Sequence, residues 1–88
     1  MSETESLLEF PCQFAVKVMG KNQADFDAVV VEIVRQHVAD ITEGAVTTRE
    51  SSTGKYTSVT VMIEAQSKAQ LDAIYYGLTA HPDVLMAL

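Results

Sequence analysis

Hydrophobic residues along this chain change their spacing from every second residue to about every 3.6 residues and back, in an order that leaves few folds open. Residues 12–19 alternate between apolar and polar, which predicts a β-strand that ends at Gly20. Residues 23–39 follow the spacing of an amphipathic helix, with Asn22 as the candidate N-cap. The residues predicted to face the core are Phe14, Val16 and Val18 in the strand, and Phe26, Val29, Val30, Ile33, Val34 and His37 in the helix.

A glycine marks a tight turn between two further strands, predicted at residues 45–51 and 55–65. Gly54 follows Thr53 and supplies the positive φ that such a turn needs. A two-residue turn at this point sets the register of the hairpin, with Arg49 opposite Ser58 and Thr47 opposite Thr60.

The last third of the chain predicts a second helix and a closing strand. Ser67 and Gln70, three residues later, have the spacing of a capping box at the start of a helix. The His81–Pro82 pair is expected to stop this helix. Residues 83–88 then alternate, with Val84, Met86 and Leu88 predicted to face inward.

Strand, helix, hairpin, helix and strand in this order predict an α+β, ferredoxin-like βαββαβ fold. Right-handed crossovers place both helices on one face of a four-stranded antiparallel sheet and leave the other face open. We expect residues 1–88 to form one domain. Residues 1–11 are expected to be an N-terminal extension, in which Leu7, Leu8 and Phe10 dock onto the domain.

The charge balance argues against one class of partner. Six Lys and Arg face twelve Asp and Glu, a net charge of −6, whereas nucleic acid is bound mainly by neutralising phosphates with Lys and Arg. The chain has no apolar stretch long enough to span a membrane and no basic and apolar regions of a signal peptide. We therefore expect a cytoplasmic protein with neither nucleic acid nor membrane as a partner. Cys12 is the single cysteine, which excludes an intramolecular disulfide and a CxxC pair.

The open face of the sheet is the first candidate binding site. Alternation along the strands predicts that it carries Lys17, Arg49, Tyr56, Ser58 and Thr60. The first and third strands are central neighbours in this fold, so we expect these side chains to converge and accept an anion or an acidic segment of a partner. An ordinary solvated face is one alternative. Self-association is another, because apolar residues are predicted around the cluster: Ala15, Met19, Met62, Leu85 and Ala87.

The junction between the first strand and the first helix is the second candidate. Gly20 precedes Asn22 and the start of the helix, where backbone N–H groups can face a carboxylate or phosphate. Glycine also ends strands for conformational reasons alone. Neither GxGxxG nor GxxxxGK[ST] accompanies it, so the signal for a ligand turn is weak.

Motifs of enzymes are missing from the sequence. HExxH, GxSxG and paired-carboxylate patterns do not occur, and His37 and His81 lie on separate predicted elements. Lys17 or Tyr56 as a proton donor would lack a partner group. Only Tyr56 is an aromatic residue predicted on the open face, whereas an RNA-binding sheet displays several. We therefore expect no catalysis, no metal and no cofactor.

Three phrases of the sequence carry a resemblance to a known family: LLEFPCQFAVKVMG, SSTGKYTSV and the closing VLMAL. Together they resemble the YbeD-like family of small bacterial proteins, which has no established biochemical activity. The resemblance implies a ferredoxin-like fold similar to the ACT regulatory domains, which bind amino acids. It also hints at a link to lipoate metabolism. The matching residues of the functional face are Lys17, Gly20, Ser51, Ser52, Gly54, Tyr56 and Ser58.

The sequence departs from the ACT pattern at the turn after the first strand. The glycine is kept as Gly20, but the acidic residue of ACT ligand sites is missing there. We therefore favour a non-enzymatic regulatory or interaction domain that binds a protein partner, or a second copy of itself, through the open face. The alternative is an ACT-like sensor of an amino acid or another small anionic metabolite, with Gly20 and Asn22 at its ligand turn.

Overall fold

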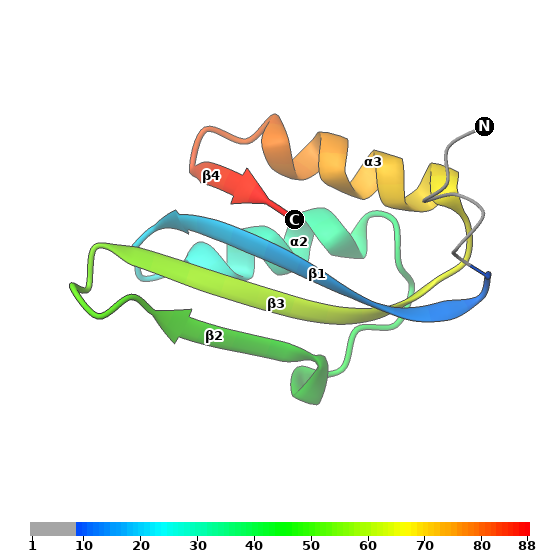
Figure 1. The fold of residues 1–88 in the computed structure, drawn as a ribbon, viewed down its shortest axis with the longest axis horizontal. Helices are drawn as coiled ribbons and strands as arrows, with labels where there is room; N and C mark the ends of the chain where they lie inside the picture. Colours follow the sequence, from blue (N-terminus) through cyan, green and yellow to red (C-terminus); the bar gives the residue numbers. More distant parts are fainter. Residues whose placement is uncertain (1–8) are drawn as a thin grey trace.

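The computed structural model describes residues 9–88. The elements follow the chain in the order β1 (Cys12–Lys21), α2 (Phe26–Arg35), the 3-10 helix η1 (Glu43–Ala45), β2 (Val46–Glu50), β3 (Tyr56–Ala65), α3 (Lys68–Thr79) and β4 (Val84–Ala87). The four strands form one antiparallel sheet in the order β2-β3-β1-β4. Helix α2 lies behind the sheet in Figure 1, and α3 runs along the side of β4. The buried residues of both helices belong to one core with the inward side chains of β1 and β3, so the other face of the sheet stays open. The predicted ferredoxin-like βαββαβ fold is confirmed.

The core lies between the sheet and the two helices. Every second side chain of β1 and β3 points into it, and the helices contribute residues three or four apart. The fully or almost fully buried apolar side chains are Val16, Val18, Phe26, Val30, Val34, Val59, Val61, Ile63, Ala65, Leu71, Ile74 and Leu78. Burial of Phe26, Val30 and Val34 in the core stabilises α2 and outweighs the low helix propensity of the β-branched run 29–31, as is usual for helices in proteins.

Helix α2 is shorter than predicted at both ends. It begins at Phe26 and not at residue 23, with Asp25 in the N-cap position, so the prediction that Asn22 caps it was wrong. It ends at Arg35, because the chain turns there and brings Val38, 8% exposed, into the core. The start of α3 is closer to prediction, since the backbone N–H of Gln70 donates to the Ser67 hydroxyl at 3.1 Å.

The hairpin between β2 and β3 has the predicted register. Arg49 pairs with Ser58 and Thr47 pairs with Thr60. Strand β2 ends at Glu50, one residue earlier than predicted, and β3 begins at Tyr56, one residue later. Gly54 takes the predicted positive φ, at 72°.

Two predictions about the sheet were wrong. Strand β1 continues through Gly20 to Lys21. In β4 the register shifts between Met19 and Gly20, so that Met86 pairs with Met19 while Val84 pairs with Gly20. The shift inserts one extra residue and reverses the alternation, as a β-bulge does.

The shift in β4 changes which of its residues face the core. Val84 and Ala87 pack against the core, whereas Met86 and Leu88 are 51% and 68% exposed. The prediction that Met86 and Leu88 face inward, and that Ala87 faces outward, was therefore wrong.

The N-terminal extension is described only from Glu9 onward, and Phe10 packs against the core as expected. Leu7 and Leu8, also expected to dock, lie outside the described residues. Within residues 9–88, no helix is long and apolar enough to cross a membrane.

Candidate functional site

The open face of the sheet is organised in rows by the register of the strands. The rows are Lys17–Thr60–Thr47, Met19–Ser58–Arg49, Ala15–Met62 and Lys21–Tyr56. Strand β4 extends two of them, because Met86 lies opposite Met19 and the backbone of Leu88 exchanges hydrogen bonds of 3.0 and 2.7 Å with Lys17. Side chains of all four strands therefore contribute to this face.

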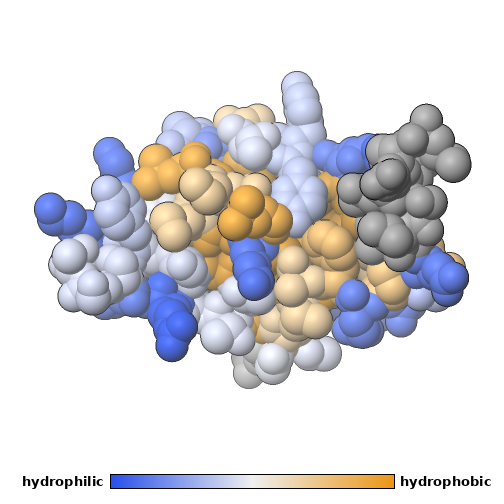
Figure 2. Space-filling view, in the orientation of Figure 1, coloured by the Kyte–Doolittle hydropathy of each residue, from blue (hydrophilic) through white to orange (hydrophobic). Residues whose placement is uncertain are grey.

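A hollow of about 140 Å³ opens on this face where β4 meets β1. Its lining residues are Lys17, Val18, Met19, Ser58, Thr60, Met86 and Leu88. Figure 2 shows that hydrophobic surface gathers over β4 and the neighbouring part of the sheet, with hydrophilic residues within it and around it. The hollow thus combines one ammonium group, two hydroxyls and a rim of thioether and aliphatic side chains.

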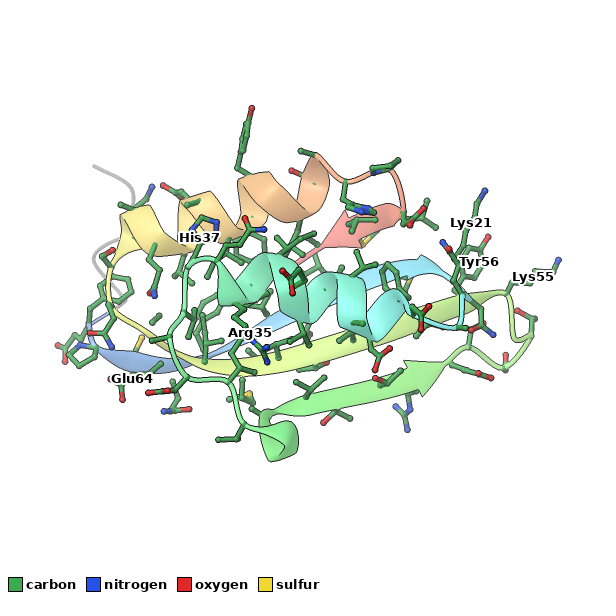
Figure 3. All side chains as sticks on the ribbon, turned by 180° about the vertical axis from the view of Figure 1, so that it is seen from behind. Lys21, Arg35, His37, Lys55, Tyr56 and Glu64 are labelled. Carbon is green, nitrogen blue, oxygen red and sulfur yellow. The ribbon has the colours of Figure 1, made fainter. Side chains whose placement is uncertain are left out.

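The structure brings three of the five predicted open-face residues into the hollow and leaves two outside. Lys17, Ser58 and Thr60 line it. Arg49 lies two strands from Lys17 and one row further along, which places their backbones about 12 Å apart for strands spaced about 4.8 Å. Tyr56 lies nearer the hairpin, beside Lys21 (Figure 3).

Charge is segregated between the two sides of the protein. Three of the six basic residues, Lys17, Lys21 and Arg49, point to the open face by strand alternation. Among the described strand residues of that face, Glu64 is the one acidic side chain. The opposite side carries acidic residues on the helices and on β2: Asp27, Glu32, Glu50 and Asp72. The open face is therefore cationic although the protein as a whole is acidic.

Tyr75 of α3 holds the end of β4 in place. Its hydroxyl donates a hydrogen bond of 2.5 Å to the backbone oxygen of Leu88, which also accepts from the Lys17 N–H. Its ring packs edge-to-face on Phe14 with centroids 6.4 Å apart. Burial raises the pKa of the Tyr75 hydroxyl, so the group stays protonated as the donor that this contact requires.

Gly20, the first residue of the second candidate site, is buried and in close contact with two elements. A Cβ at this position would lie 2.3 Å from Phe26 Cζ and 2.5 Å from the Asp83 backbone oxygen. A side chain does not fit there without a shift of helix α2 or of the segment before β4. The packing of the core accounts for a glycine at this position without a ligand.

Asn22, the other residue of that candidate, connects the end of β1 to the hairpin. Its Nδ2 donates to the Gly54 backbone oxygen at 2.8 Å, and its Oδ1 accepts from the Thr57 hydroxyl at 2.9 Å. Its backbone N–H donates to the Lys55 oxygen at 3.0 Å. Both polar atoms of the side chain are therefore already engaged within the protein.

Sequence reasoning missed Met86 and Leu88 as residues of the open face. Strict alternation from Val84 placed them in the core, and nothing in VLMAL marks the extra residue of the bulge. Within residues 9–88, no three His, Cys, Asp or Glu side chains lie close enough together to hold a metal ion.

Comparison with known proteins places this geometry in a family. Residues 5–88 match the family described as "Protein of unknown function (DUF493)". A UPF0250 protein of Paraburkholderia phytofirmans is 47% identical over 99% of this chain and 98% of its own length. UPF0250 proteins of Chromobacterium violaceum and Neisseria gonorrhoeae are each 45% identical, over 98% and 100% of this chain and 97% and 100% of their own lengths.

One solved structure supports the fold. The solution structure of protein HP0495 from H. pylori superposes with a TM-score of 0.74, at 16% identity, over 92% of this chain and 85% of its own. At this identity the likeness concerns the fold alone. The family match and the full-length relatives show that this chain belongs to the DUF493 family, as the resemblance to the YbeD-like proteins led us to expect.

Proposed function

We propose that this protein is a non-catalytic interaction domain that binds an acidic, apolar segment of a protein partner through its open sheet face. The observation that carries the proposal is the hollow around Lys17, which joins a single cation to an exposed apolar rim. No other function is favoured as strongly by the arrangement of the described residues.

The apolar part of the surface supports a protein partner. Five large hydrophobic side chains of the open face, Met19, Tyr56, Met62, Met86 and Leu88, are between 39% and 68% exposed. Exposed hydrophobic side chains gathered on one face are typical of a surface that binds another molecule. Three of the five are methionines, whose flexible thioether side chains adapt to different apolar surfaces.

The charges select the kind of segment. Lys17 lies in the hollow, and Lys21 and Arg49 lie on the same face with one strand carboxylate, Glu64, among the described residues. A carboxylate on the partner that reaches Lys17 would gain a charge-assisted hydrogen bond in a partly apolar environment. Leucine or methionine residues on either side of it would cover the rim.

The alternative of a small-molecule sensor at the Gly20–Asn22 turn, including one that serves lipoate metabolism, has less geometric support. The space beside Gly20 is filled by Phe26, and the Asn22 amide is bonded to Gly54 and Thr57. A metabolite screen by thermal shift separates the two functions. A ligand at 100 times its Kd stabilises the folded protein by about 2.7 kcal/mol.

The test follows the methionine methyl groups by NMR in protein labelled with ¹³C-methyl methionine. The probe is an amphipathic helical peptide whose apolar face carries one glutamate between leucines, compared with a peptide in which lysine replaces that glutamate. We expect the glutamate peptide to shift the signals of Met19, Met62 and Met86. Lys17→Ala should weaken its binding about tenfold, the usual contribution of a hydrogen bond to a charged group.

Arg35→Ala is the matched control, because it removes one positive charge from α2, which lies on the other side of the sheet (Figure 3). It should leave the affinity within twofold of wild type. Equal binding of the two peptides, or equal losses in the two variants, would show that the open face does not select acidic segments and would overturn the proposal.

A further inference from the structure

Strand β2 forms one edge of the sheet and presents unpaired backbone groups along it. Ser51 donates its N–H to the Tyr56 oxygen, so the odd-numbered residues of β2 direct their N–H and C=O groups toward β3. By the same alternation Val46, Thr48 and Glu50 direct theirs away from the sheet. Figure 1 shows no element beside this edge among the described residues.

The two edges of the sheet differ in regularity. Strand β4 has four residues and a register shift, which disrupts the straight ladder that another strand would need. Strand β2 pairs with β3 without a shift through all five of its residues. It carries three β-branched residues and no proline, and its two charged residues, Arg49 and Glu50, stand together at one end of the strand.

We propose that β2 pairs antiparallel with β2 of a second copy, with Thr48 opposite Thr48 across a two-fold axis. The proposal does not rest on the proposed function, because it uses the backbone of an edge and not the hollow. The outward-directed residues are even-numbered, so only registers that pair even with even can form. The sequence VTTRE selects among these registers by charge.

The Thr48–Thr48 register pairs all five residues of the strand. It places Thr47 opposite Arg49 of the second copy and Val46 opposite Glu50, and no like charges face each other. A shift toward Glu50 places Arg49 opposite Arg49, and a larger shift places Glu50 opposite Glu50, which is unfavourable. A shift toward Val46 leaves Arg49 and Glu50 without a strand residue opposite.

The two-fold pairing would continue the sheet across both copies. The open faces of the two copies would become one surface, with an Arg49 from each copy near the axis. Each copy carries a net charge of −6, so general repulsion opposes the association until salt screens it. We therefore expect the dimer to tighten as ionic strength rises.

The test is sedimentation equilibrium of the full chain from micromolar to millimolar concentration at physiological salt. Wild type should approach twice the chain mass of 9.6 kDa. Thr48→Pro removes an outward N–H, which edge strands tolerate, and should remain at the monomer mass. Thr48→Ala keeps that N–H and should behave like wild type. A wild type that stays monomeric throughout, or a Thr48→Pro variant that still dimerises, overturns the proposal.

Charge variants at Thr47 test the register even if Thr48→Pro does not fold. In the proposed pairing, the two-fold axis places position 47 of each copy opposite Arg49 of the other, so Thr47→Glu adds two opposite-charge pairs and should tighten the dimer about 2- to 30-fold. Thr47→Lys adds two like-charge pairs and should weaken the dimer by a similar factor. General repulsion between acidic chains predicts the opposite order. That opposite order, or equal affinities of the two variants, contradicts the Thr48–Thr48 register.

Discussion

Replacing Gly20 by alanine tests whether this glycine serves packing or a ligand. The new Cβ would lie 2.3 and 2.4 Å from two ring atoms of Phe26 and 2.5 Å from the Asp83 oxygen. Phe26 is 1% exposed, so its ring is enclosed by the core and cannot turn out into solvent, and the Asp83 oxygen belongs to the backbone that leads into β4. The substitution therefore overpacks the core at the point where β1, α2 and β4 meet.

The magnitude follows from two opposing effects. Overpacking of a tight core typically destabilises by about 1–3 kcal/mol, and contacts this short place Gly20→Ala at the upper end. Alanine also lowers the conformational entropy of the unfolded chain relative to glycine, which stabilises the folded protein by about 0.4–1 kcal/mol. We expect a net loss of about 2 kcal/mol in the free energy of unfolding. For a domain of this size that lowers Tm by roughly 8–16 °C.

Urea unfolding followed by circular dichroism measures this effect directly. Gly44→Ala is the matched control, because a Cβ at Gly44 meets nothing within 4 Å and should change stability by less than about 0.5 kcal/mol. In a Phe26→Leu background, Gly20→Ala should cost less, since the clashing ring atoms are gone. If Gly20→Ala and Gly44→Ala have the same stability, the packing explanation of Gly20 is wrong.

Two further predictions concern hydrogen bonds. Asn22→Ala removes the acceptor of the Thr57 hydroxyl, and Thr57 is only 3% exposed, so we expect the protein to lose about 1–3 kcal/mol of stability. Gln23→Ala, at the exposed residue next to Asn22, should be near neutral in the same urea titration. Burial raises the pKa of Tyr75 above 10.0, so the folded state holds the proton more tightly than the unfolded state, and stability is lost as pH rises above 10.0. Tyr75→Phe should show a smaller loss of stability between about pH 9 and pH 11, and equal pH slopes for the two proteins would contradict this assignment.

The hairpin and the central strands could be predicted from sequence because local rules determine them. Side chains of β1 and β3 alternate between the two faces of the sheet, so once one apolar residue is assigned to the core, the face of every other residue in the strand follows. Gly54 fixed the position of the turn, and the turn set the register that pairs Arg49 with Ser58. Placing Lys17, Ser58 and Thr60 on the open face needed no more information than this.

The ends of α2 could not be predicted in the same way. The helical spacing continues beyond Arg35, but the chain leaves the helix there. The carbonyl of His37 then accepts a hydrogen bond of 2.9 Å from the side chain of Gln70, which is far away in sequence. Asn22 is likewise held by Gly54 and Thr57. Contacts between distant residues therefore overrode the local signals at both ends: the helical spacing beyond Arg35 and the N-cap preference of Asn22.

The apolar rim of the candidate site depends on the same kind of long-range contact. If β4 alternated without the register shift, Met86 and Leu88 would face the core, and the hollow would lose the wall that these two residues form. The register shift beside Gly20 turns these two side chains outward, and the hydrogen bonds from Tyr75 and Lys17 to Leu88 keep the strand in that phase. The glycine that sequence analysis assigned to a ligand turn thus contributes to the binding surface indirectly. It lets Phe26 and the segment before β4 approach β1 closely enough for the shifted register to form.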